Sequence, residues 1–155
     1  MALVYSAGVV PVRQSKGKSE YLLMRSRHYI DFPKGKLEDN ETFLGAALRE
    51  TKEESGLWDL DFAWGTVYKE TDPYKTKSNG KKAKKVSRYY LARVNSGEVK
   101  IVPNEETGVV EHDNFYWVTY EEAKDFPLQP RIKEILDWAR SLVENENVNS
   151  VSEES

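Results

Sequence analysis

Apolar residues near the start of the chain recur in a pattern typical of β-strands. Residues 3–13 and 20–26 are rich in β-branched and large apolar side chains, and the polar segment between them contains Gly17. This pattern predicts a β-hairpin. Further strands are predicted at residues 60–70, 86–94, 97–102 and 115–119.

Between residues 42 and 55 the spacing of the apolar positions becomes helical. The repeating positions are Leu44, Leu48, Thr51 and Ser55, with no proline among them. The same helix carries Glu50, Glu53 and Glu54, whose i, i+3 and i+4 spacing places three carboxylates on a different face. Like charges repel one another, and a hard divalent cation such as Mg²⁺ among their oxygens would cancel that repulsion. This face is therefore a predicted metal site.

The residues that flank these carboxylates suit structural roles. Gly35 fits a turn or a close approach of the backbone to a ligand, and Gly56 fits the left-handed position at the end of a helix. Arg49 is placed to pair with Glu41 at the helix entrance and so to hold the preceding loop.

The last part of the chain is predicted to be helical. Thr119 is expected to cap a short helix over residues 120–125, and a longer helix starts near Pro130, a favoured first-turn residue. Its apolar face consists of Ile132, Ile135, Leu136, Ala139, Leu142 and Val143. Beyond Glu144 there is little to bury, so we expect one folded domain over residues 1–144 and a disordered acidic tail over residues 145–155.

Length and composition restrict the class of protein. A chain of 155 residues is long enough for one domain with its own core. The absence of cysteine excludes disulfides, thiolate metal sites and cysteine nucleophiles, and is compatible with a reducing cytoplasm. The first twelve residues lack the basic region of a signal peptide, and no run reaches the roughly 18 apolar residues of a membrane helix. We therefore expect a cytoplasmic protein that does not enter a membrane.

A basic segment lies within a chain whose net charge is −3. Residues 73–93 contain eight lysines or arginines and no acid, and Ser78-Asn79-Gly80 within them predicts a turn. The lysines nearest the next strand are Lys81, Lys82, Lys84 and Lys85. Such a run suits a solvated hairpin tip, but beside a carboxylate metal site it would also attract phosphates. Arg27, between a predicted strand and the acidic helix, suits a phosphate contact and a solvated loop equally well.

The stretch from Gly35 to Leu57 resembles the signature of the Nudix hydrolase family. That signature has a glycine, a glutamate six positions later, then Arg-Glu-x-x-Glu-Glu-x-Gly and an aliphatic residue, and each fixed position is present here. Thr51 departs from the aliphatic residue usual at its position. The resemblance implies an α/β/α sandwich with a mixed β-sheet between helices, a helix that binds divalent cations, and hydrolysis of a nucleoside diphosphate linked to another moiety.

A second segment narrows the resemblance within that family. Residues 110–118 resemble the Glu-His-x-x-aromatic-x-Trp segment of the asymmetrically cleaving diadenosine tetraphosphate hydrolases. The Lys-rich loop followed by Tyr-Tyr-Leu-Ala at residues 89–92 is also similar to that branch. The resemblance implies that Glu111 is a further catalytic or metal carboxylate. It also implies that Lys34 contacts phosphate, or binds metal through its carbonyl, and that Tyr89 stacks on a nucleobase.

These residues suit attack of water on a phosphorus atom of a phosphoanhydride, with Mg²⁺, or Mn²⁺ as the alternative, as cofactor. Glu50, Glu53, Glu54 and Glu111 would bind metal, and Glu53 or Glu111 would accept the proton of the water. The small-molecule substrate that the resemblance implies is diadenosine tetraphosphate, cleaved to ATP and AMP. The alternatives are a diphosphoinositol polyphosphate, an RNA 5′ end from which a cap or pyrophosphate is removed, and a non-catalytic nucleotide-binding module, which the intact set of glutamates disfavours.

Overall fold

The computed structural model describes residues 2–101, 103, 108 and 112–154 of the chain. Within these residues a single mixed sheet contains nine strands. They are β1 (Ala2–Ser15), β2 (Lys18–Ser26), β3 (Ile30–Asp31), β4 (Lys34–Lys36), β5 (Leu60–Asp61), β6 (Tyr68–Glu70), β7 (Tyr74–Ser78), β8 (Lys81–Val94) and β9 (His112–Val118). The strand order is β3-β2-β1-β8-β5, with β4 on β1, β6 and β7 on β8, and β9 on β2.

The centre of the sheet is the parallel pair of β1 and β8, in register from Ala2 opposite Ala83 to Val12 opposite Arg93. The other strand pairs of the described residues are antiparallel. Successive side chains of a strand point to opposite faces, so Val9 and Tyr90 belong to one core cluster and Val10 and Tyr89 to another.

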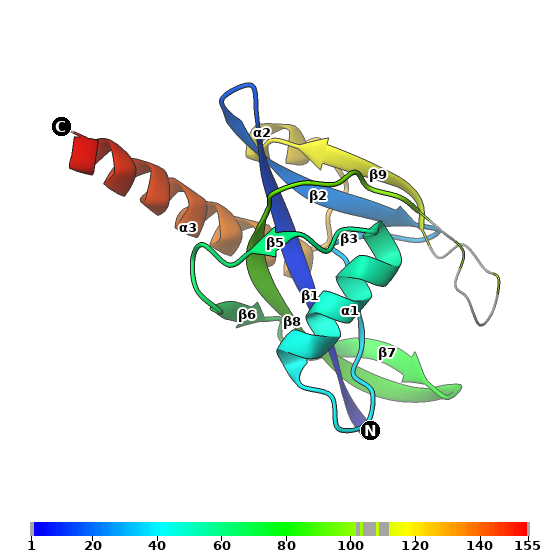
Figure 1. The fold of residues 1–155 in the computed structure, drawn as a ribbon. Coiled ribbons are helices and arrows are strands. Elements are labelled where there is room, and N and C mark those ends of the chain that lie inside the picture. The colour runs from blue at the N-terminus through cyan, green and yellow to red at the C-terminus, as the bar shows by residue number, and fades with distance from the viewer. Residues whose placement is uncertain (1, 102, 104–107, 109–111, 155) are drawn as a thin grey trace.

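A helix covers each of these two clusters (Figure 1). Helix α1 (Phe43–Ser55) packs Ala46 and Ala47 on the first cluster, and helix α3 (Pro130–Glu154) packs its apolar stripe on the second. The short helix α2 (Tyr120–Ala123) contributes Ala123 to the α3 side. The predicted α/β/α sandwich with a mixed sheet is therefore confirmed.

The predicted position of the first hairpin turn and the predicted ends of the helices agree with the structure. The β1–β2 hairpin turns at Lys16 and Gly17, both with positive φ. The Thr42 side chain accepts the N–H of Gly45 at the start of α1, and Gly56 ends α1 with φ of 79°. A capping box between Thr119 and Glu122 starts α2.

Two predicted strands differ from the structure. The single strand predicted over residues 60–70 is two short strands, β5 and β6, because the chain turns at Gly65, whose φ is 81° and whose N–H donates to Phe62. The short strand predicted over residues 97–102 is absent from residues 97–101. There the Lys100 N–H donates to the carbonyl of Ser55 at 2.8 Å. This hydrogen bond satisfies a carbonyl at the C-terminal end of α1 instead of pairing with a strand.

The apolar stripe predicted for α1 is also only half right. Thr51 and Ser55 are buried, each with its hydroxyl bonded to the carbonyl four residues earlier, whereas Leu48 is exposed. Small residues, Ala46 and Ala47, face the sheet in its place, because they let the helix approach the strands closely.

Helix α3 continues to Glu154, ten residues past the predicted end of the folded domain at Glu144. The disordered tail over residues 145–155 and the domain boundary stay predictions. Among the described residues, no helix is both long and apolar enough to cross a membrane.

Candidate active site

Strand β4 and helix α1 lie against each other at Gly35. A Cβ built on Gly35 would overlap the carboxyl group of Glu50, so only a residue without a side chain admits that carboxyl so close to the strand. Gly35 has an ordinary backbone conformation, because it is not among the residues with positive φ. Of the two reasons predicted for a glycine here, close approach is the one found, and the group that approaches is a side chain of the protein.

Arg49 ties the loop between β4 and α1 to the helix, as the sequence predicted. Its Nε and Nη2 donate to the two carboxylate oxygens of Glu41 at 2.8 and 3.0 Å, and Nη2 also donates to the carbonyl of Lys36 at 3.0 Å. This forked pairing lowers the pKa of Glu41 to about 2. Arg49 Nη1 donates to Glu50 at 2.9 Å, so the same guanidinium also orients a predicted metal ligand.

Glu54 is the buried carboxylate of the acidic helix. Its Oε2 accepts the backbone N–H of Lys34 at 3.0 Å and lies 3.9 Å from Nε2 of His112. Burial raises the pKa of Glu54 well above its usual value, opposed by Lys34 and reinforced by the negative charge of Glu50. A buried carboxylate beside a second carboxylate is the environment that a divalent cation would stabilise.

The three glutamates are not equally placed. Glu50 and Glu54 face β4, whereas Glu53 is 58% exposed and accepts from Arg49 at 3.2 Å. Among the described residues, no three acidic or histidine side chains are already gathered as a metal site. Glu111, predicted as a fourth ligand, lies outside the described residues. The carboxylate oxygens of Glu50 and Glu54 nevertheless form a donor set that fits Mg²⁺.

Lys34 connects these carboxylates to the core. While its backbone N–H holds Glu54, its ammonium lies 3.1 Å from Oδ2 of Asp31, a buried carboxylate on β3. Burial is the largest single influence on the pKa of Lys34 and acts to lower it, but the charge of Asp31, the nearby Tyr74 and Tyr29 and the hydrogen bond to Asp31 together outweigh burial, so the pKa is raised. The ammonium therefore stays protonated, as a phosphate contact requires.

The role predicted for Tyr89 is wrong. Its ring has no exposed surface, packs edge-on against Phe32, and its hydroxyl donates to Oδ1 of Asp31 at 2.7 Å. A nucleobase cannot stack on a ring that is covered on every side. Tyr89 instead fixes Asp31, the partner of Lys34.

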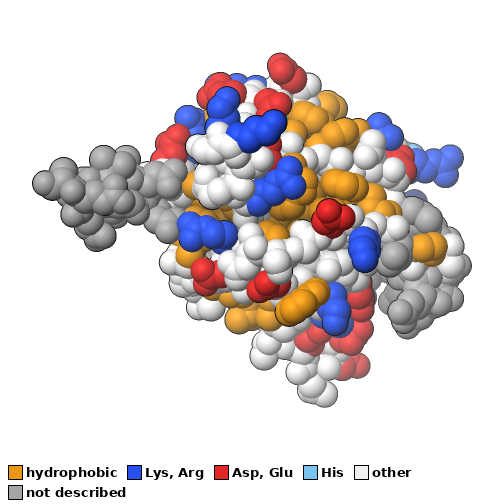
Figure 2. Space-filling view, turned by 45° about the horizontal axis from the view of Figure 1, so that its top comes forward, with side chains coloured by type: hydrophobic (Ala, Val, Ile, Leu, Met, Phe, Trp, Pro, Cys, Tyr) orange, Lys and Arg blue, Asp and Glu red, His pale blue; other side chains and the backbone are white. Residues whose placement is uncertain are grey.

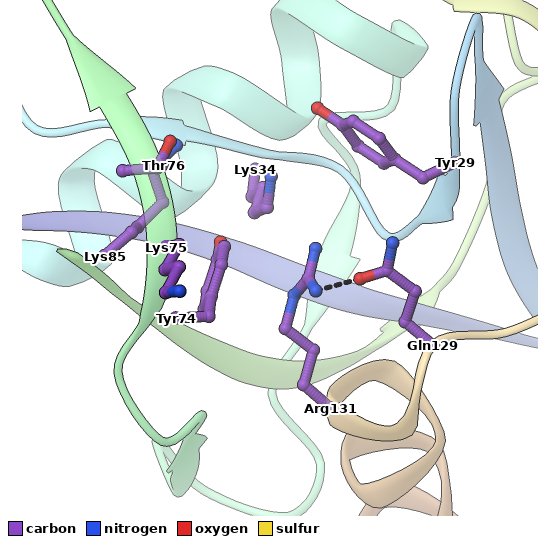
Figure 3. A pocket seen from close by; sticks show the side chains of 8 residues that line it. All are labelled: Tyr29, Lys34, Tyr74, Lys75, Thr76, Lys85, Gln129 and Arg131. Atoms are coloured by element: carbon purple, nitrogen blue, oxygen red, sulfur yellow. Dashed lines mark hydrogen bonds between the residues drawn. The ribbon is translucent and has the colours of Figure 1, made fainter. Parts of the chain in front are cut away.

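A cavity of about 480 Å³ opens beside Lys34. Figure 3 shows side chains from distant parts of the chain meeting there: Tyr29, Lys34, Tyr74, Lys75, Thr76, Lys85, Gln129 and Arg131. The wall thus combines four cationic side chains with two aromatic rings. Burial lowers the pKa of Lys85, and the neighbouring charge of Lys34 lowers it further. A bound anion would relieve this repulsion.

The predicted substrate contacts separate into two groups. Lys34 and Lys85 line the cavity. Lys81, Lys82 and Lys84 are exposed on the β7–β8 hairpin, and Arg27 is exposed in the turn before β3, and none of these four lines the cavity.

Four residues of this region were not predicted from the sequence: Asp31, Tyr29, Tyr74 and Arg131. Tyr74 faces the cavity because it pairs with Lys85 across β7 and β8. Only that strand register, which local patterns do not provide, would have identified it. Asp31 adjoins the signature stretch but follows no pattern of its own, and Arg131 resembles any polar residue of a first helical turn.

Comparisons with known proteins agree with this geometry. A model of the NUDIX domain matches residues 2–139. The curated bis(5′-nucleosyl)-tetraphosphatase (asymmetrical) of Caenorhabditis elegans is 32% identical over 124 residues, which are 78% of this chain and 83% of that protein.

Solved structures give the same result. A binary complex of a C. elegans Ap4A hydrolase superposes with a TM-score of 0.65 at 26% identity, over 95% of this chain and 98% of that one. The MutT protein of Methanosarcina mazei Go1 shares the fold at a TM-score of 0.59 and 20% identity, over 94% and 96% of the two chains. With the complete acidic signature held on α1 and a matching domain over most of its length, the chain belongs to the Nudix hydrolase family.

Proposed function

We propose that this protein hydrolyses a phosphoanhydride bond of a dinucleoside polyphosphate, converting diadenosine tetraphosphate to ATP and AMP. The observation that carries the proposal is the position of Lys34, whose backbone holds Glu54 while its side chain lines a cationic cavity. A phosphate chain that lies along Lys34 would have one phosphorus atom at the carboxylates and its remaining phosphates in the cavity.

The aromatic rings of the cavity favour a nucleotide over an inositol phosphate. Tyr29 is 41% exposed, and Tyr74 lies at the start of β7; both rings line the cavity. Aromatic rings stack on nucleobases, whereas inositol offers no flat face to a ring. Tyr29, the more exposed of the two rings, therefore replaces Tyr89 as the proposed stacking residue. The relative from C. elegans, an asymmetrical bis(5′-nucleosyl)-tetraphosphatase, supports the same substrate.

Each charged group has a proposed task. Glu50 and Glu54 would hold a divalent cation, with Glu53 and Glu111 as further candidates. When bound, Mg²⁺ neutralises charge on the phosphate oxygens and lowers the pKa of water. Lys34 and Lys85 would bind the phosphates that are not attacked. Glu53 or Glu111 would take the proton from the attacking water.

Product analysis tests this proposal. Purified protein with Mg²⁺ is incubated with diadenosine tetraphosphate and, separately, with a diphosphoinositol polyphosphate. We expect equal amounts of ATP and AMP from the first substrate and no phosphate from the second. Two molecules of ADP would contradict the position of cleavage, and release of phosphate from the second substrate alone would contradict the substrate class.

A further inference from the structure

Arg131 extends from the first turn of α3 into the cavity (Figure 3). Its guanidinium carbon lies 4.0 Å from the centre of the Tyr74 ring, and its Nη1 donates to the side-chain oxygen of Gln129. Its Nε is buried and has no hydrogen-bond partner. The guanidinium is thus held in place by a ring and a neutral amide.

A second arginine of α3, Arg140, also stacks on a tyrosine ring, but it is paired with a carboxylate. Arg140 stacks on Tyr120 at 3.9 Å, and its Nε donates to the carboxylate of Glu144 at 2.8 Å. In contrast, no carboxylate of the described residues lies within ion-pair distance of Arg131. A partly buried guanidinium without a counter-ion is costly, so an anion that enters the cavity would supply the missing charge.

The other cations of the cavity increase this effect. Asp31 neutralises Lys34, and it is the only carboxylate of the described residues that forms an ion pair with a cation of the cavity wall. Lys75 and Lys85 add further positive charge to that wall. An anion there needs several acceptor oxygens in order to reach both the Lys34 side and the α3 side. A chain of phosphates offers such oxygens at several positions along its length, whereas those of a single phosphate all lie on one phosphorus atom.

We propose that Arg131 is a specificity-determining residue that binds the phosphates of the substrate farthest from the attacked bond. This inference rests on the proposed function in so far as the phosphate chain of the substrate occupies the cavity. The stack on Tyr74 presents the guanidinium edge with its donors directed at the ligand. Arg131 therefore contributes to substrate affinity without taking part in the chemical step.

Binding of inorganic tripolyphosphate by the full chain, measured by calorimetry without divalent metal, tests the inference independently of turnover. Arg131→Gln should weaken binding about tenfold, the size expected for one charge-assisted hydrogen-bonding group. Arg140→Gln, the matched control, should leave binding unchanged. Unchanged affinity in a folded Arg131→Gln protein would overturn the proposal.

Steady-state kinetics with diadenosine tetraphosphate give the second measurement. Arg131→Gln should raise KM about tenfold and leave kcat within about twofold, because the contact is the same in the ground state and the transition state. A fall in kcat with unchanged KM would overturn the assignment. If the wild-type protein does not cleave this substrate but tripolyphosphate binding still depends on Arg131, the proposed function fails and the present inference stands.

A conservative variant covers the possibility that glutamine at this position unfolds the protein. Arg131→Lys keeps the charge but loses the planar stack on Tyr74. Its affinity for tripolyphosphate should lie between those of the wild type and Arg131→Gln, with an unchanged melting temperature. A melting temperature lowered together with a complete loss of binding would show that Arg131 serves the fold instead.

Discussion

At the scale of single residues, the candidate active site depends on residues that leave room for a neighbouring side chain or hold it in place by a hydrogen bond. Gly35 admits the Glu50 carboxyl, Tyr89 directs Asp31, and Asp31 directs the Lys34 ammonium. The charges of Glu50 and Lys34 followed from residue type, whereas their roles as metal ligand and phosphate contact stay predictions. The burial of Tyr89 and the hydrogen bond of its hydroxyl to Asp31 were not predicted. Both faces of this strand are buried, so the sequence does not indicate which residue the hydroxyl contacts.

Gly35→Ala should reduce activity much more than stability. The new Cβ overlaps the far end of the flexible Glu50 side chain, which can move aside at little cost but then leaves its place at the site. We expect kcat/KM to fall by at least about tenfold, as for other displaced ligand partners, with a nearly unchanged melting temperature.

Gly17→Ala is the control for this change. Gly17 has no neighbour within 4 Å but has φ of 77°, so alanine there should cost roughly 1 kcal/mol and leave kcat/KM unchanged. Equal loss of activity in both variants would contradict the role of Gly35.

Glu54→Gln should abolish turnover and change how stability depends on pH. Because the pKa of Glu54 is raised in the folded protein, the folded state binds this proton more tightly than the unfolded state does. Its contribution to stability is therefore lost as pH rises from the unfolded pKa through the folded one. Without divalent metal, the free energy of unfolding of Glu54→Gln relative to wild type should be larger at pH 8 than at pH 5.

Urea denaturation in the presence of a chelator measures this difference. Activity with Mg²⁺ should fall by more than about 100-fold. Loss of a residue that only orients a metal ligand costs about 10–100-fold, and loss of the ligand itself should cost at least as much. The same relative stability at both pH values would contradict the raised pKa of the buried Glu54 carboxyl.

At the scale of elements, the loop between β4 and α1 and the helix behave as one unit through Arg49. The caps of α1 at Thr42 and Gly56 are local in sequence and were therefore predictable. The forked pair of Arg49 with Glu41 spans eight residues and was also predicted, because the signature fixes both partners. The close packing of α1 through alanines was not predicted, since it depends on the strands beneath.

Glu41→Gln should remove part of the sensitivity of the protein to acid. The pKa of Glu41 is lowered to about 2 in the folded protein from 4.5, so its stabilising contribution is complete above the unfolded pKa and is lost as pH falls towards about 2. The free energy of unfolding of the wild type should therefore approach that of Glu41→Gln between pH 5 and about 2.5.

Chemical denaturation across this range provides the measurement. Arg49→Ala should cost roughly 1–3 kcal/mol at pH 7 because it leaves Glu41 without its charged partner. A pH-independent gap between wild type and Glu41→Gln would contradict the role of this ion pair.

At the scale of the whole molecule, charge is distributed unevenly between surface and cavity. On the face shown in Figure 2, lysines and arginines are interspersed with acidic and hydrophobic side chains. Four cationic side chains gather in the cavity, where β4, β7, β8 and α3 meet, and Lys81, Lys82 and Lys84 are exposed on the β7–β8 hairpin beside it. That meeting depends on the pairing of Tyr74 with Lys85 and on the packing of α3, which are long-range features that no local sequence pattern contains.

The lysines of the β7–β8 hairpin should therefore divide into two classes. Lys85→Gln should raise KM for diadenosine tetraphosphate at all salt concentrations, because Lys85 lines the cavity. Joint replacement of Lys81, Lys82 and Lys84 by glutamine should lower kcat/KM only at low salt, because exposed charges act at long range.

Kinetics at low ionic strength and near about 1 M, where screening acts within about 3 Å, distinguish the two classes. A salt-independent effect of the triple variant would place the exposed lysines in direct contact with substrate.

The parallel pairing of β1 with β8 also bears on how the protein is made. Each residue of β1 from Ala2 to Val12 is matched to the residue 81 positions later in β8, and this pair is the centre of the sheet. On the ribosome, β1 and β2 emerge early as a hairpin whose inner edge has no partner until β8 has been synthesised. Folding should consequently be slow for a protein of this size, and the growing chain should depend on chaperones that cover that open edge.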